Sequence, residues 1–93
     1  MTYFKLNTKI TRMQQQDKKI LKRLGRRIKK LREEQKYSLN EFALGKGITP
    51  ATLSRIENEL VDVKFITLVK VSNAFQIPLG EILTGLDLQY DLD

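Results

Sequence analysis

The stretch from Ser38 to Asn58 constrains the fold most, because it carries the start and stop signals of two short helices. Ser38, with Glu41 three residues later, has the pattern of a capping box at a helix start. Gly45 and Gly47 then end that helix, since glycine adopts left-handed backbone angles at little cost. These signals predict a short helix followed by a tight turn.

A second helix is predicted directly after this turn. Thr49 is a suitable cap, and Pro50 stands at the first helical position, where its missing N–H removes no hydrogen bond. Leu53 and Ile56 have the spacing of a buried stripe. The residues left on the outer side are Ala51, Thr52, Ser54, Arg55 and Asn58.

This pair of helices resembles the helix-turn-helix of the lambda-repressor/Cro-like (Xre-type) DNA-binding family. The run from Thr52 to Asn58 is close to the usual recognition-helix sequence of that family, and the similarity extends from about Leu24 to Leu83. The resemblance implies an all-α, five-helix lambda-repressor-like domain with short N- and C-terminal extensions. The matching residues are Ala43 at the helix crossing, Gly47 in the turn, and Ile48, Leu53 and Ile56 as apolar contacts.

The chain is thereby divided into an N-terminal extension (1–16), a helix-turn-helix domain (17–84) and an acidic C-terminal tail (85–93). Residues 1–10 alternate loosely, which favours an extended tail or at most a short strand. Asp17 is a suitable cap, so the first confident helix is expected over 17–36, although it could begin within 11–16. The fourth and fifth helices are expected over 65–76 and 78–83. The alternation over 86–93 suggests a strand, which could pair with residues 3–9 or with its copy in a second subunit.

Charge is unevenly distributed along the chain. The net charge is +6, but residues 1–36 hold thirteen Lys and Arg against three acidic residues, a net +10, and the rest is net −4. A strongly positive segment suits a polyanion such as nucleic acid. The basic helix face could be solvated, could flank phosphates, or could lie on a membrane surface or bind calmodulin. We do not favour the last two partners, because the apolar face lacks aromatic bulk and is needed for the core.

Composition argues against catalysis and metal binding. The chain has no cysteine and no histidine, which removes thiolate nucleophiles, disulfides, the usual zinc ligands and a base for any serine. The glycines around Lys46 lack the spacing of a phosphate-binding loop. No apolar run approaches the roughly twenty residues that span a bilayer. We therefore expect a cytoplasmic protein that is no enzyme and has no cofactor, metal or membrane contact. The resemblance further implies a bacterial or phage-encoded protein.

The resemblance implies base contacts from Pro50, Ala51 and Arg55, with Thr49, Thr52 and Ser54 beside them. An arginine can fork onto guanine O6 and N7, although Arg55 could instead be solvated or paired within its helix. The family usually has glutamine at the position of Leu39, where it binds a phosphate. Phosphate contacts are therefore expected from Ser38, Asn40, Lys46, Asn58 or the basic stretch 18–36.

Two structural roles are also implied by the resemblance. Arg32 and Glu57 should form a buried ion pair between the first helix and the end of the recognition helix. The family usually dimerises, and the candidate interface is the fifth helix with the tail, although Ile82 could equally belong to the core. The candidate interface residues are Leu79, Ile82, Leu86, Leu88 and Tyr90.

The function predicted from these features is a sequence-specific transcriptional regulator, a repressor, that binds operator DNA as a homodimer through the helix Thr49–Asn58. An antitoxin-like or other protein-binding module is the first alternative, with residues 1–16 and 86–93 as its interacting parts. A non-specific nucleic-acid binder driven by charge alone is the second.

Overall fold

The structure, a computed structural model, describes residues 2–58 and 60–90, with side chains from residue 15 onward. Its helices are α1 (Thr2–Glu34), α2 (Leu39–Ala43), α3 (Pro50–Glu57), α4 (Phe65–Phe75) and α5 (Leu79–Leu83). Within these described residues there is no strand. The fold is therefore the all-α, five-helix lambda-repressor-like fold that the sequence predicted.

The first helix is longer than predicted. It starts at Thr2, so the expectation of an extended N-terminal segment was wrong, and Asp17 lies inside the helix and caps nothing. Residues 2–16 contain neither glycine nor proline. A helix bonds its own backbone groups, whereas a lone strand leaves them without partners, so helix prevails. The predicted C-terminal strand is absent over residues 86–90, and residues 91–93 lie outside the described residues.

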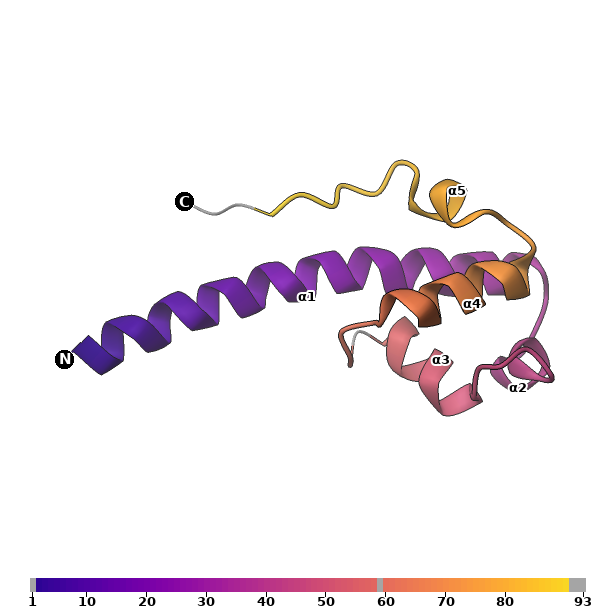
Figure 1. The fold of residues 1–93 in the computed structure, drawn as a ribbon, viewed down its shortest axis with the longest axis horizontal. Helices are drawn as coiled ribbons and strands as arrows, with labels where there is room; N and C mark the ends of the chain where they lie inside the picture. Colours follow the sequence, from indigo (N-terminus) through magenta and orange to yellow (C-terminus); the bar gives the residue numbers. More distant parts are fainter. Residues whose placement is uncertain (1, 59, 91–93) are drawn as a thin grey trace.

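Helix α1 is the axis around which the other elements are arranged. Its 33 residues account for the longest dimension of the molecule, 51 Å. Figure 1 shows α2 and α3 on one side of α1, and α5 with the C-terminal segment on the other. Helix α4 packs against α5, and its Phe75 contacts Phe42 of α2. The helix-turn-helix is thus presented on the side of α1 opposite to the C-terminal segment.

The core is built from one apolar face of each helix. The Phe42 and Phe75 rings lie 4.3 Å apart between centroids and join α2 to α4. Burying an aliphatic or aromatic side chain of this size contributes roughly 1.5–3 kcal/mol, so these contacts set the positions of the helices. The buried apolar residues are Leu24, Ile28, Phe42, Ala43, Ile48, Leu53, Ile56, Val71, Ala74, Phe75 and Ile82.

A glycine permits the close crossing of α1 and α3. A Cβ atom added at Gly25 would lie 2.5 Å from the carbonyl oxygen of Ile56 and 3.0 Å from that of Glu57. Real Cβ atoms do not approach backbone oxygens so closely. Gly25 therefore lets the C-terminal end of α3 lie directly against the backbone of α1.

Two arginines of α1 hold the C-terminal part of the chain. Arg27 Nη1 donates hydrogen bonds to the carbonyl oxygens of Ile82 (2.9 Å) and Thr84 (3.0 Å), at the end of α5. Arg23 donates to the carbonyl oxygen of Asp87 and forms an ion pair with its carboxylate at 3.9 Å. Because helix ends leave carbonyl groups without intrahelical partners, Arg27 serves as a side-chain cap for α5.

Candidate nucleic-acid interface

The start of α3 is fixed by its capping residue. Thr49 Oγ1 accepts a hydrogen bond from the backbone N–H of Thr52 (3.0 Å) and donates one to the Thr52 hydroxyl (2.9 Å). Pro50 occupies the first helical position, as predicted. Both threonine side chains are thus ordered by their own helix turn, and the cap and the first turn of α3 form one rigid unit.

The outer side of α3 is open to solvent. Pro50, Ala51 and Arg55 are exposed, whereas Leu53 and Ile56 are fully buried below them. Among the described residues, no group is within hydrogen-bond or ion-pair distance of the Arg55 side chain. Glu59 lies outside the described residues. The three residues to which the resemblance assigns base contacts therefore share one accessible surface.

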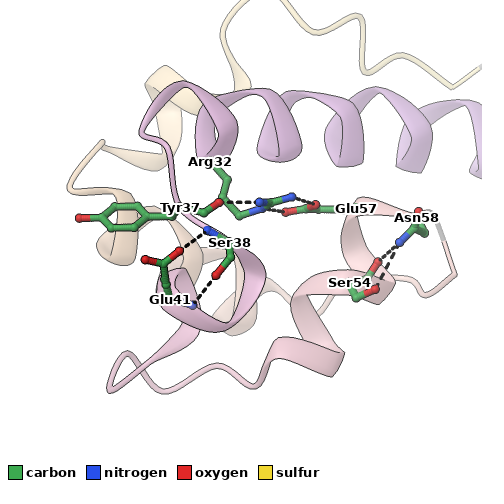
Figure 2. Close-up of polar contacts among 7 residues, drawn as sticks. All are labelled: Arg32, Tyr37, Ser38, Glu41, Ser54, Glu57 and Asn58. Carbon is green, nitrogen blue, oxygen red and sulfur yellow. Dashed lines mark hydrogen bonds and ion pairs between the residues drawn. The ribbon is translucent and has the colours of Figure 1, made fainter.

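The C-terminal end of α3 is closed by an asparagine. Asn58 Nδ2 donates to the Ser54 carbonyl oxygen at 2.8 Å and to Ser54 Oγ at 3.3 Å, as Figure 2 shows. Ser54 is half-buried and Asn58 is exposed. The amide of Asn58 is thus used to end the helix.

Helix α2 begins with the predicted capping box. Ser38 Oγ accepts from the Glu41 backbone N–H (3.1 Å), and the Ser38 backbone N–H donates to Glu41 Oε1 (3.0 Å; Figure 2). The backbone and side-chain hydrogen bonds from Ser38 lower the pKa of the Glu41 carboxyl group. Asn40 is exposed on the same helix, while Leu39 packs against the core. Asn40 is therefore the α2 side chain best placed to reach a ligand.

The turn between α2 and α3 contains both left-handed glycines. Gly45 has φ = 69° and Gly47 has φ = 76°, so the predicted reason for the two glycines is confirmed. Lys46 between them is half-buried. Its Nζ lies 5.0 Å from the centroid of the Phe42 ring and 3.5 Å from the carbonyl oxygen of Ala74. The Lys46 ammonium is thus directed onto Phe42 and the end of α4.

A buried ion pair docks α3 on α1. Arg32 Nε and Nη2 donate to Glu57 Oε2 and Oε1 at 2.8 and 2.9 Å, and Arg32 Nη1 donates to the Tyr37 carbonyl oxygen at 2.6 Å (Figure 2). Arg32 is 8% and Glu57 7% exposed. The hydrogen bond that Arg32 donates to Glu57 raises the pKa of the Arg32 guanidinium, against the lowering effect of burial. The structure thus contains the bidentate pair that the resemblance implies, and this pair fixes the angle of α3.

The basic residues of α1 divide into two groups. Arg26, Lys29 and Lys30 are exposed and are free to meet phosphates. Arg27, which the basic-face hypothesis grouped with them, instead bonds the end of α5. The exposed cations are therefore the α1 side chains available to a duplex, and Arg27 is not among them.

The dimer residues proposed from the sequence are mostly engaged within the chain. Ile82 is 1% exposed and belongs to the core, so its assignment to an interface was wrong. Leu86 packs against the core, and Leu79 is half-buried. Desolvation, followed by a hydrogen bond to Asp17, raises the pKa of the Tyr90 hydroxyl. Leu88, at 40% exposure, is the most accessible of the five.

Sequence reasoning missed Gly25 and Arg27. An isolated glycine inside a helical pattern commonly has a packing reason, so Gly25 carried a usable signal. Arg27 carried none, since its partners lie 55 and 57 positions further along the chain.

The geometry defines the class of the domain: a capped, solvent-facing helix after a tight two-glycine turn, docked on a basic first helix, is a helix-turn-helix domain. The helix-turn-helix family model matches residues 28–82. The chain therefore belongs to the helix-turn-helix family of the lambda-repressor/Xre type, whose members are DNA-binding regulators.

Over 55 residues the chain is 40% identical to the HTH-type transcriptional repressor RghR of Bacillus subtilis (strain 168). This similarity covers 58% of the chain and 41% of the relative, so the chain matches less than half of the length of that protein. No solved structure matches the chain. Within its described part, no helix combines the length and the apolar character needed to cross a membrane.

Proposed function

We propose that this protein is a transcriptional repressor that binds operator DNA sequence-specifically as a homodimer, with α3 in the major groove. The observation that carries the proposal is the exposure of Pro50, Ala51 and Arg55 on a helix whose other side is anchored in the core. Membership of the helix-turn-helix family and the similarity to a transcriptional repressor support it. In this docking, residues near the start of the recognition helix meet base edges.

Base reading is assigned to the outer side of α3. Arg55 forks onto guanine O6 and N7, and the methyl group of Ala51 contacts a thymine methyl. Pro50 has no hydrogen-bond donor, so it contributes only to the shape of the surface that meets the DNA. Thr49 and Thr52, held by their mutual hydrogen bond, lie beside these residues and contact a phosphate or a thymine methyl. Ser54 is half-buried and has a minor role.

Phosphate contacts are assigned to exposed polar groups around α3. Asn40 and Ser38 of α2 lie on one flank. Asn58 is omitted, because its amide group already donates to Ser54. Lys46 is omitted, because its ammonium lies over the Phe42 ring. The exposed cations of α1 add long-range attraction for the duplex, which supplies affinity but not sequence preference.

The test begins with selection of a preferred duplex from random sequences on the purified protein. Arg55→Ala should then lose about 1–3 kcal/mol of binding on the selected duplex and little on a random one. Arg26→Ala, an exposed arginine of α1, is the matched control: it should weaken both duplexes alike and reduce the salt slope by about one. Equal losses for Arg55→Ala on both duplexes would reject the base-reading role.

The same experiment distinguishes the proposed function from the alternative in which the protein binds nucleic acid through charge alone. A protein bound by phosphate attraction alone yields no enriched sequence, and its affinity for all duplexes falls with the same steep dependence on salt. Enrichment of one sequence together with a shallower slope on that duplex supports the proposal.

A further inference from the structure

The outer side of α4 is apolar although it faces solvent. Phe65 is 67%, Ile66 64% and Val69 39% exposed. The buried residues Val71, Ala74 and Phe75 already attach the opposite side of this helix to the core, so core packing does not account for the three exposed ones.

The exposed apolar residues of α4 form a single patch. Val69 lies four positions after Phe65 and three after Ile66, and residues at these spacings are neighbours on a helix surface, so the three lie together at the start of α4. Leu60, 71% exposed, precedes them in the linker, where its backbone N–H donates to the Arg55 carbonyl oxygen at 2.9 Å. The linker thus leads from the end of the recognition helix to this patch, which we call the α4 patch (Leu60, Phe65, Ile66 and Val69). Contiguous exposed apolar surface of this kind marks an interaction site.

The charges around the α4 patch suit a second copy of the chain. No member of the patch is charged, so two molecules that each carry a net charge of +6 bring no like charges together within the patch itself. Exposed Asp62 and Lys64 precede Phe65 and carry opposite charges. A two-fold axis through the patch turns the Asp62 carboxylate of one copy toward the Lys64 ammonium of the other.

We propose that the α4 patch is the face through which two copies of this chain associate on DNA. This inference rests on the proposed function and replaces the tail interface expected from the sequence. Because the patch follows α3 in the chain, pairing through it keeps the two recognition helices near the axis, as two half-sites about one helical turn apart require.

The size of the patch indicates when the dimer forms. With roughly 150–200 Å² for each side chain when fully exposed, the four exposures sum to about 400 Å² of apolar surface. Stable interfaces bury about 800 Å² on each partner. The pair is therefore weak in free solution and forms when a duplex with two half-sites holds both copies.

The decisive variant is Ile66→Glu. An acidic residue in the first turn of a helix interacts favourably with the helix dipole, so α4 should remain folded, which circular dichroism checks. Two copies would now bring like charges together, and binding to a duplex with two half-sites should lose its cooperativity and weaken by about a hundredfold. Binding to a single half-site should be unchanged. Leu88→Glu is the matched control for the tail interface and should keep cooperativity.

A second measurement uses the absence of cysteine from the chain. Ile66→Cys should cross-link to itself through a short bismaleimide on the two-half-site duplex, and more weakly at high protein concentration without DNA. Gln35→Cys, at an exposed turn remote from the α4 patch, should not cross-link under either condition.

The outcomes separate the two proposals. Retained cooperativity in Ile66→Glu, or its loss in Leu88→Glu alone, overturns the α4 interface. A different protein that co-purifies with the wild-type chain and is lost in Ile66→Glu, without self-cross-linking of Ile66→Cys, assigns the patch to that partner and also overturns it. If the wild-type chain binds no duplex, the proposed function fails, and cross-linking without DNA still decides whether the α4 patches pair.

Discussion

Replacing Gly25 with alanine tests whether the crossing of α1 and α3 requires a residue without a side chain. The new methyl group would lie 2.5 Å from the Ile56 carbonyl oxygen and 3.0 Å from that of Glu57. Both oxygens belong to the backbone of α3, so no side-chain rotation can relieve the contact. The end of α3 must move away from α1, and it carries Glu57 with it.

Two opposing effects set the size of the change. Overpacking typically lowers the unfolding free energy by about 1–3 kcal/mol. A clash with an anchored backbone lies at the upper end of this range, at about 3 kcal/mol. Alanine in place of glycine inside a helix stabilises the folded protein by about 1 kcal/mol, which offsets part of this loss. The expected result is a loss of about 2 kcal/mol of unfolding free energy, with a fall in Tm on the order of 10 °C.

Urea denaturation followed by circular dichroism measures this loss, and Gly80→Ala is the matched control. Gly80 is also helical, and an added Cβ there meets nothing within 4 Å. Gly80→Ala should therefore stabilise the protein by about 0.4–1 kcal/mol. If Gly25→Ala stabilises to the same degree, the close crossing of α1 and α3 is refuted.

Three further predictions concern polar contacts. Arg32→Met leaves the Glu57 carboxylate buried without its partner and should cost about 3–5 kcal/mol of unfolding free energy in urea denaturation. Arg27→Ala removes the cap of α5 and should cost about 1 kcal/mol, measured in the same way. The folded-state pKa of Glu41 is lowered by Ser38, so its contribution is complete above the ordinary carboxyl pKa and is lost as the pH falls through the lowered one. The stability advantage of wild type over Glu41→Gln should therefore disappear in acid, in a pH series of denaturation curves.

Each of these predictions has a matched control. The double variant Arg32→Met with Glu57→Leu should lose less than Arg32→Met alone, and an equal loss would contradict the account of a stranded charge. Arg26→Ala should leave stability unchanged, and an equal loss in Arg26→Ala and Arg27→Ala would remove the capping role. A difference between wild type and Glu41→Gln that is independent of pH would exclude the carboxylate as its source.

Local signals predicted the helix-turn-helix well. The capping box at Ser38, the left-handed glycines and Thr49 before Pro50 each depend on a few neighbouring residues, so the sequence contains the whole cause. The helix ends were close as well: α4 was expected to reach Gln76, which instead ends the helix in a left-handed conformation (φ = 59°).

The sequence did not allow contacts between residues far apart in the chain to be predicted. The alternation at the start of the chain favoured an extended tail. The described residues contain no neighbouring strand that could bond the backbone of such a tail, and the segment is helical. Lys46 carried a phosphate role, which stays a prediction, and its ammonium lies 3.5 Å from the carbonyl oxygen of Ala74, 28 positions further along the chain. Ile82 was assigned to the interface because it is hydrophobic. In the structure it is buried, and its helix α5 packs against α4 and α1.

Helix α3 is anchored through Leu53, Ile56 and Glu57, while Pro50, Ala51 and Arg55 point away from every anchor. In the function proposed above, different residues of α3 therefore hold the helix in place and select its DNA target. The exposed residues of α3 can be substituted at little cost in folding free energy. The DNA target that we propose for this helix can therefore change during evolution, and a protein designer can change it in the same way.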